Sequence, residues 1–337
     1  MRIVAKAPCR VDMAGGTLDI WPLYLHHPQA VTVNFAIDRY TTCEIETNDN
    51  KSVTLRSRDQ NAEESFPSLA GMNGARRPKL ALLAYVLRHF APEQGLTIQT
   101  HSESPRGAGI AGSSSLIIAV ASALNKLTNS RHNLEKLREI AQNIEAQIIR
   151  VPTGAQDYYP ALYGGVSAVE LGCAGIRRVS IPVDPEELSE RTVLAYTGEP
   201  RESGINNWEV TKAYIDGDRK VHRNFEQIAA IANGMRQALE KSDWQEAGRL
   251  LREEWSHRRK NAPGITTPAI DELVRVAKRA GAMGAKVCGA GGGGCVFFLV
   301  ERGAREKASQ TLAKAGAEIL PVKVVPKGVS VRISGDS

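Results

Sequence analysis

Cysteine and aromatic residues are scarce in this chain of 337 residues, where aromatic side chains make up 5%. The five cysteines are odd in number and scattered, and no two of them form a Cys-x-x-Cys pair: Cys9, Cys43, Cys173, Cys288 and Cys295. Neither a disulfide framework nor a zinc site is therefore expected. Such cysteine usage favours a reducing compartment.

The sequence also lacks the long apolar segments that insert into membranes. Residues 1–6 contain nothing like the apolar core of a signal peptide, which argues against secretion. The longest apolar run, residues 116–124, has only about half the length of a membrane span. We expect a soluble, cytoplasmic protein that does not contact membranes.

Charge of one sign is not in large excess, since the formal net charge is +6. This balance suits a protein that handles anions but does not identify them. Basic clusters at residues 76–79 and 258–260 have no aromatic residues among them. We interpret them as solvated surface rather than as contacts to nucleic acid, so no nucleic-acid partner is expected.

A Walker A pattern is absent, which disfavours a P-loop nucleotidase. The chain instead contains residues 104–116, Ser-Pro-Arg-Gly-Ala-Gly-Ile-Ala-Gly-Ser-Ser-Ser-Leu. The glycines permit a close approach of backbone to a ligand, and apolar residues at helical spacing follow the serines. The stretch thus leads to a helix N-terminus, where unpaired N–H groups and the helix dipole favour an anion such as phosphate.

Two other interpretations of this stretch stay open on these residues alone. Residues 107–112 satisfy Gly-x-Gly-x-x-Gly after an expected strand at 95–101, as in dinucleotide-binding folds. The second strand and the acidic residue of such a fold are missing, however. A plain glycine-rich turn with a serine helix cap is the other possibility. The serine run favours a triphosphate site, because a hydroxyl beside phosphate oxygens is a natural Mg²⁺ ligand.

Length predicts two domains, because 337 residues exceed what one core usually fills. Strands are expected at 3–7 (ending at Pro8), 30–37, 41–46, 52–56, 95–101, 165–171, 175–181, 192–197, 285–288 and 295–300. Helices are expected at 79–90, 113–127, 134–149, 206–216, 221–241, 244–259 and 267–281. A boundary near residues 182–187 divides the chain into domains 1–185 and 186–337.

Two further stretches combine glycines with polar residues. Residues 9–19 contain a Gly15-Gly16 turn beside Arg10, Thr17 and Asp19, a set of groups that suits a polyol. Residues 289–294 contain five glycines in six positions, more than a tight turn needs. We expect this second stretch to make close backbone contact with a ligand or with the first domain.

Two carboxylates lie between these stretches. Glu145 is at the edge of the apolar stripe of the expected helix 134–149, and Asp157 follows a helix break among apolar and aromatic neighbours. Each has an ordinary alternative, a surface residue for Glu145 and a helix cap for Asp157.

In this order, the stretches resemble the three motifs of the GHMP kinase superfamily, named for galactokinase, homoserine kinase, mevalonate kinase and phosphomevalonate kinase. The motifs fall at residues 8–19, 104–115 and 286–295. In the first motif, the stretch Ala-Gly-Gly-Thr-Leu-Asp is most similar to the corresponding stretch of sugar kinases that act on heptose phosphates. Glu145 and the Gly-Ala-Gln-Asp-Tyr element ending at Tyr158 match the spacing of that branch.

The sequence departs from the family pattern in two places. The second motif is one residue longer than the usual Gly-x-Gly-Leu-Gly-Ser-Ser. The first motif lacks the Glu-His pair of galactokinase, which weighs against galactose as the substrate.

The resemblance implies an α+β fold, the two-domain GHMP kinase fold, with a ribosomal S5 domain 2-like N-terminal domain and a ferredoxin-like C-terminal domain. It also implies roles for individual residues. Asp157 would be the base or orienting carboxylate, Arg10 would stabilise developing charge, and Ser114 with Glu145 would hold Mg²⁺. ATP would contact Pro105, Gly107, Ala108, Gly109, Ile110, Ala111, Gly112, Ser113 and Ser114. The acceptor would contact Arg10, Gly15, Gly16, Thr17, Asp19, Asp157, Gly291 and Gly292.

The function that the resemblance implies is an ATP- and Mg²⁺-dependent phosphotransferase acting on an alcohol group of a sugar or sugar phosphate. The anomeric hydroxyl of a heptose 7-phosphate is the best single choice. Fucose-, glucuronate- and mevalonate-type acceptors are alternatives, as are a catalytically silent ATP and sugar sensor of the same fold and an NAD-binding protein. We also consider a homodimer.

Overall fold

Two β-sheets organise the chain, which the computed structural model describes over residues 1–200 and 205–334. The first sheet has the strand order β12-β1-β2-β5-β3-β4, and β6 and β7 extend from β2. Among the described strands of this sheet, only the pairing of β3 with β5 is parallel. Its strands are β1 (Arg2–Ala14), β2 (Val31–Asn48), β3 (Val53–Ser57), β4 (Ala62–Phe66), β5 (Gly95–Ser102), β6 (Val166–Gly172), β7 (Gly175–Ile181) and β12 (Ser330–Ser334).

The central strands β1 and β2 are longer than the sequence pattern indicates. β1 continues through Pro8 because the ladder with β2 shifts register between Pro8 and Cys9 and again between Asp12 and Ala14. The expectation that this strand ends at Pro8 is therefore wrong. The runs 30–37 and 41–46 likewise form one strand, β2. The continuation of β1 carries Arg10 and Asp12 into the interior.

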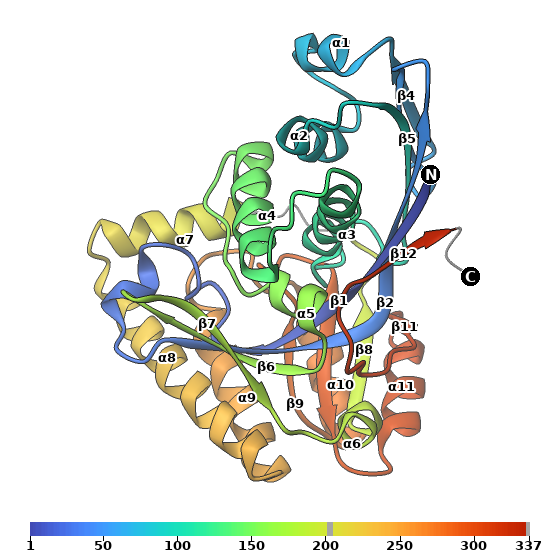
Figure 1. Ribbon diagram of the computed structural model, residues 1–337. Coiled ribbons are helices and arrows are strands. Elements are labelled where there is room, and N and C mark those ends of the chain that lie inside the picture. Colours follow the sequence, from blue (N-terminus) through green and yellow to red (C-terminus); the bar gives the residue numbers. More distant parts are fainter. Residues whose placement is uncertain (201–204, 335–337) are drawn as a thin grey trace.

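Helices cover one face of the first sheet (Figure 1). They are α1 (Leu69–Gly74), α2 (Ala81–Phe90), α3 (Gly112–Leu127), α4 (Leu134–Ile149) and α5 (Tyr158–Tyr163). Helix α3 packs against β1, β2, α2 and α4, and its residues from Ser114 to Leu124 are buried. The start of α3 is consequently held in a fixed place beside the middle of β1, where the Ser115 hydroxyl donates to the Ala7 carbonyl at 3.0 Å.

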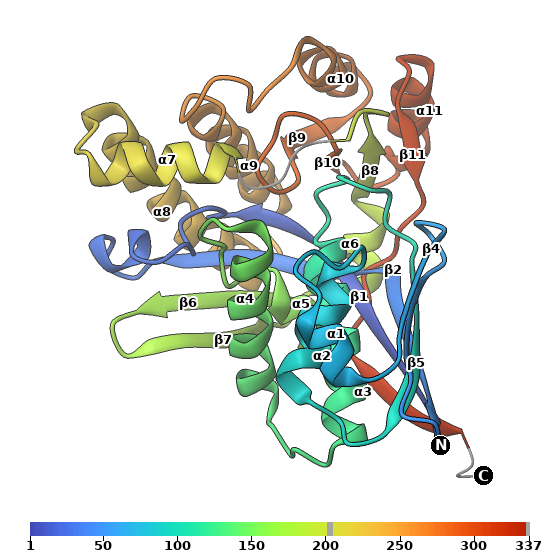
Figure 2. The ribbon, with the colours of Figure 1, turned by 90° about the horizontal axis from the view of Figure 1, so that it is seen from above.

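The second sheet has the order β11-β8-β10-β9 and is antiparallel throughout. Its strands are β8 (Thr192–Tyr196), β9 (Ala282–Val287), β10 (Cys295–Val300) and β11 (Glu318–Leu320). The accompanying helices are α6 (Pro185–Glu190), α7 (Ile205–Ile215), α8 (Arg219–Glu240), α9 (Trp244–Arg258), α10 (Pro268–Arg279) and α11 (Arg305–Lys314); a short 3-10 helix, η1 (Leu23–His26), follows β1. Figure 2 shows α9 to α11 and this sheet on one side of β1 and β2, with α1 to α4 on the other.

A shared apolar core joins the two sheets. Phe35 on β2 and Phe297 on β10 lie edge to face with ring centroids 5.6 Å apart, and both are fully buried. After β11 the chain returns to the first sheet, where β12 pairs with β1. The division between residues 185 and 186 stays a prediction. None of the helices within the described residues has the length and apolar character that crossing a bilayer requires.

Candidate active site

The start of α3 and the loop before it, residues 105–111, form the first part of the site, and we call these residues the glycine loop. The N-cap residue Ala111 has a left-handed backbone (φ 59°) and no side chain caps the helix. The hydroxyls of Ser113 and Ser114 instead donate to the carboxylate of Glu145, at 2.5 and 2.8 Å. The serine-cap interpretation is therefore wrong. The first N–H groups of α3 have no partner inside the helix, which makes this end suited to an anion.

Glu145 on α4 completes this cluster. Its Oε2 accepts hydrogen bonds from Ser114 and from the hydroxyl of Tyr158, the latter at 2.5 Å. Glu145 is buried rather than a surface residue. Burial raises the pKa of its carboxyl, the three hydroxyl donors oppose that rise, and Asp157 adds to it. A nearby cation stabilises the ionised form of a buried carboxylate.

The donor set at Glu145 fits Mg²⁺, which prefers oxygen ligands. Within the described residues, no group of three or more His, Cys, Asp and Glu side chains gathers to hold a metal ion. Mg²⁺ commonly binds through one or two carboxylates and completes its coordination with water and substrate phosphates. Glu145 with Ser113 and Ser114 therefore suits a Mg²⁺ ion that arrives with a nucleotide.

Asp157 directly precedes α5, but its side chain does not cap that helix. Its Oδ1 accepts two hydrogen bonds from Arg10, from Nε at 3.0 Å and from Nη2 at 2.7 Å. In the part of the chain that the structure describes, Oδ2 accepts no hydrogen bond, and the side chain is 28% exposed. Asp157 thus has one oxygen fixed and one available to a ligand.

Arg10 links Asp157 to the glycine loop. Its Nη1 donates to the Gly109 carbonyl at 2.6 Å, and its backbone N–H donates to the Ile110 carbonyl at 3.0 Å. Arg10 is 2% exposed. Burial alone would lower the pKa of its guanidinium, but Asp157 and Asp12 outweigh burial and raise that pKa. Arg10 stays charged and fixes the position of the Asp157 carboxylate relative to the glycine loop.

A second buried carboxylate, Asp19, lies beside the segment before α5. Its Oδ2 accepts the N–H of Gln156 at 2.9 Å. A Cβ added at Gly154 would lie 2.0 Å from the same oxygen, so only glycine fits there. Burial, and next the charge of Asp157, raise the pKa of Asp19 to about 6. Residues 15–19, which we call the acceptor loop after the role that the sequence predicts for them, therefore approach the Asp157 segment.

Four buried charged residues of the site were not predicted: Asp12, Glu254, Arg258 and Lys286. Lys286 forms an ion pair with Asp12, and Arg258 donates to the Gly16 carbonyl at 2.8 Å. The interpretation of Arg258 as solvated surface is wrong. Helical spacing could have identified it, because Leu251, Glu254, Trp255 and Arg258 follow the buried stripe of α9.

The glycine-rich residues 289–294, which we call the glycine run, touch the glycine loop. A Cβ at Gly294 would lie 2.7 Å from the Ala108 carbonyl oxygen, and Cys295 donates its N–H to that oxygen at 2.7 Å. The expected contact with the first domain is confirmed at this point. Gly291 and Gly292 lie against Ile265, to whose carbonyl Gly292 donates at 3.0 Å. Their contact with an acceptor stays a prediction.

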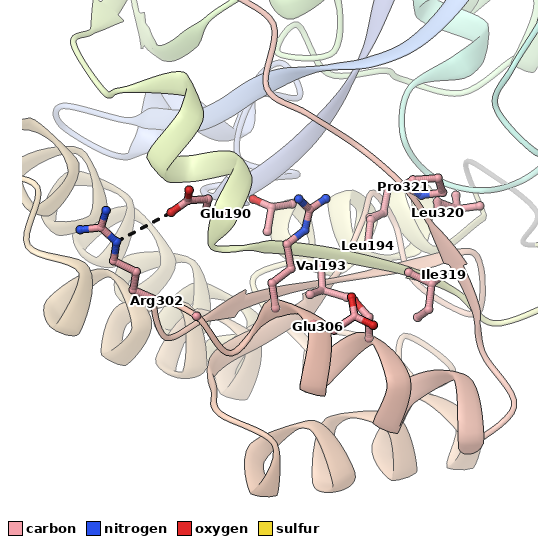
Figure 3. A pocket seen from close by; sticks show the side chains of 12 residues that line it. Glu190, Val193, Leu194, Arg302, Glu306, Ile319, Leu320 and Pro321 are labelled. Carbon is pink, nitrogen blue, oxygen red and sulfur yellow. Dashed lines mark ion pairs between the residues drawn. The ribbon is translucent and has the colours of Figure 1, made fainter.

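A surface cavity of about 630 Å³ lies elsewhere, beside β8 and β11 and the start of α11 (Figure 3). Val193, Ile319 and Leu320 line it together with Glu190 and Arg302, which form an exposed ion pair. None of the site residues described above lines this cavity. The chemistry of the site is therefore not located there.

Two family models match the sequence. The model of the GHMP kinases N terminal domain matches residues 79–165, and that of the GHMP kinases C terminal matches residues 235–318. The first match includes the glycine loop, Glu145 and Asp157. The second includes Glu254, Arg258 and Lys286.

Individual relatives match over nearly the whole chain. The sequence is 25% identical over 338 residues to D-glycero-alpha-D-manno-heptose 7-phosphate kinase of Campylobacter jejuni, covering 97% of this chain and 98% of that protein. It is 23% identical over 361 residues to the mevalonate kinase of Thermococcus sibiricus, with 98% of each covered. The crystal structure of a D-glycero-D-manno-heptose 1-phosphate kinase from Bacteroides thetaiotaomicron is similar with a TM-score of 0.79 and 23% identity, covering 98% of this chain and 99% of that one.

Proposed function

Because the chain belongs to the GHMP kinase superfamily, we propose that it transfers the γ-phosphoryl group of ATP to a hydroxyl of a sugar or sugar phosphate. One observation carries this proposal. Arg10 donates two hydrogen bonds to Asp157 and a third to the glycine loop. The same side chain therefore holds both the carboxylate that would orient the acceptor hydroxyl and the loop that would bind the phosphates.

Phosphoryl transfer needs an aligned nucleophile and neutralised phosphate charge. The N–H groups at the start of α3 would bind the triphosphate, together with Pro105, Gly107, Ala108, Gly109, Ile110, Ala111, Gly112, Ser113 and Ser114. Ser114 and Glu145 would hold Mg²⁺, which supplies positive charge next to the phosphate oxygens. Oδ2 of Asp157 would accept the hydrogen bond of the acceptor hydroxyl and orient or deprotonate it. Arg10 keeps that carboxylate in place.

The acceptor loop supports a polyhydroxylated substrate. Asp19 offers a buried carboxylate near Asp157, and Thr17 offers a half-buried hydroxyl that already accepts a hydrogen bond from Arg258; both groups suit hydrogen bonds with sugar hydroxyls. We propose the anomeric hydroxyl of a heptose 7-phosphate as the acceptor, in line with the relative of that name. Fucose-, glucuronate- and mevalonate-type acceptors are the alternatives. A cytoplasmic location is part of the proposal, and a homodimer stays a prediction.

A coupled ADP-release screen tests the acceptor class. Wild-type protein with Mg-ATP is assayed against heptose 7-phosphate, fucose, glucuronate, galactose and mevalonate. We expect turnover with a sugar or sugar phosphate. Turnover with mevalonate alone would overturn the substrate class. ATP binding without turnover of any acceptor would instead indicate a silent sensor.

A further inference from the structure

Arg258, at the end of α9, makes contacts that tie the acceptor loop to the glycine run. Its Nη1 donates to the Gly16 carbonyl at 2.8 Å, and its Nη2 donates to the Thr17 hydroxyl at 3.1 Å and to the Gly289 carbonyl at 2.8 Å. Arg258 is 4% exposed. One planar guanidinium thus fixes two segments that are far apart in sequence.

The surroundings of Arg258 leave it little freedom. Glu254, one helical turn earlier, lies 3.6 Å from its Nη1. A Cβ added at Gly16 would lie 2.7 Å from that Nη1 and 2.9 Å from Oδ2 of Asp12. The acceptor loop therefore packs directly on the guanidinium, with no room for a side chain at this position.

Asp12 extends this arrangement toward Asp157. It accepts the Gly289 N–H at 3.1 Å, pairs with Lys286, and lies 3.6 Å from Nη1 of Arg10. Burial alone would raise the pKa of Asp12, but Lys286, Arg10 and Arg258 outweigh burial and hold that pKa below its usual range. A line of buried charges thus runs from Arg258 through Asp12 to Arg10, which holds Asp157.

Stability alone does not account for so many buried charges. A buried ion pair often stabilises a fold no better than apolar residues of similar volume, because desolvation opposes the attraction. Both carboxylate oxygens of Glu254 are buried without a hydrogen-bond partner within the described residues. These buried charges instead fix the positions of the backbone and side-chain groups that they contact.

We propose that Arg258 is a positioning residue for the phosphoryl acceptor: it fixes the acceptor loop and the glycine run relative to Asp157. This inference rests on the proposed function, because it assumes that residues 15–19 bind the acceptor. Within the described residues, the side-chain hydrogen bonds of Arg258 end on residues 16, 17 and 289, and none ends on the glycine loop. Its loss should therefore affect the acceptor more than the nucleotide.

The test compares Arg258→Met with Arg258→Lys and with the matched control Arg259→Met. Arg259 is the next residue, and its ion pair with Asp271 is partly exposed. For Arg258→Met we expect the KM for the acceptor to rise about tenfold or more with a fall in kcat, while the Kd for Mg-ATP without acceptor changes less than about twofold. Arg258→Lys keeps the charge and should recover part of the loss, and Arg259→Met should resemble wild type.

Three results would overturn the inference: an unchanged KM for the acceptor, an equal loss of affinity for ATP, or an equal effect in Arg259→Met. If Arg258→Met does not fold, the KM for the acceptor and the Kd for Mg-ATP are measured in Arg258→Lys instead. An unchanged KM for the acceptor in Arg258→Lys would contradict the positioning role of Arg258. If wild-type protein turns over no acceptor, the proposed function fails by itself.

If wild-type protein turns over no acceptor, amide hydrogen exchange still tests whether Arg258 positions the acceptor loop. Exchange in residues 13–19 should be faster in Arg258→Lys or Arg258→Met than in wild type, with exchange in α3 unchanged. Equal exchange in residues 13–19 would contradict the positioning role.

Discussion

The carboxylate of Asp157 has two unlike oxygens, one bound twice by Arg10 and one without a partner among the described residues. In Asp157→Asn, the amide oxygen can still accept from Arg10, but the side chain can no longer take a proton. We expect kcat to fall by about 10²–10⁴. The affinity for Mg-ATP, measured by calorimetric titration, should stay close to that of wild type. Turnover within a factor of about two of wild type would contradict the role of Asp157.

Asp19 should make stability depend on pH. Its pKa is raised from 3.8 to about 6 in the folded protein, by burial first and then by Asp157. A raised carboxyl pKa stabilises the fold below the pKa of the unfolded chain, and this contribution is lost as pH rises through the folded pKa. Relative to Asp19→Asn, wild type should therefore lose roughly 2–3 kcal/mol of unfolding free energy between pH 3.8 and pH 6.

Urea unfolding of wild type and Asp19→Asn at several pH values measures this difference directly. The comparison cancels the contribution of most other titrating groups, because both proteins share them. A difference that stays constant across this pH range would show that Asp19 titrates normally.

At the residue scale, the sequence identified several groups within the motifs but missed Asp12 and Lys286, which also lie in motif stretches and whose pairing only tertiary packing reveals. Ser114, Glu145 and Asp157 lie in glycine-rich or helix-edge patterns with recognisable spacing. Arg258 lies in a run of basic residues that looks solvated, and only the fold turns it toward Gly16. The helical spacing of α9 places Arg258 on the buried stripe, but its partners Gly16 and Thr17 lie more than two hundred positions away, and no local pattern identifies them.

The element that carries most of the site is α3 with the glycine loop before it, and the glycine run packs against this loop. Gly294 has φ 76°, and an added Cβ would meet backbone atoms of Ala108 and Gly107 at 2.7–2.9 Å. Gly294→Ala should therefore displace the glycine loop and weaken ATP binding.

Gly303 offers a matched control, since its φ is 81° and an added Cβ would meet nothing within 4 Å. Gly303→Ala should cost roughly 1–2 kcal/mol of unfolding free energy from backbone strain alone. Gly294→Ala should cost at least about 1 kcal/mol more, because close contacts add to the strain. Equal losses in the two variants, with unchanged ATP affinity, would contradict the proposed packing.

Elements with strong periodicity were predicted, whereas elements that depend on distant partners were not. Helices α3 and α4 follow from apolar residues at helical spacing. The sequence pattern predicts too early an end for strand β1, at Pro8, because proline usually interrupts a ladder. The register shift between Pro8 and Cys9 accommodates this proline, and nothing in the local sequence reports such a shift.

At the scale of the whole molecule, strand β12 forms an edge of the first sheet and covers β1. Strand β12 pairs with residues 2–6 of β1, and its Val331 and Ile333 pack against the apolar core. A chain that ends at Gly328 should lose roughly 2–4 kcal/mol of unfolding free energy, because the strand's hydrogen bonds and apolar contacts are removed. A chain that ends at Ser334 keeps the strand and serves as the control. Equal urea midpoints for the two chains would contradict this account.

We propose that Asp157, Arg10 and the start of α3 together transfer the γ-phosphoryl group of ATP to a sugar hydroxyl. Phosphorus NMR of wild type and Asp157→Asn, each incubated with Mg-ATP and the sugar and sugar-phosphate panel, tests it most directly. We predict a new sugar phosphate with wild type and almost none with Asp157→Asn. The absence of any phosphorylated sugar with wild type, or equal product with both proteins, would contradict the claim.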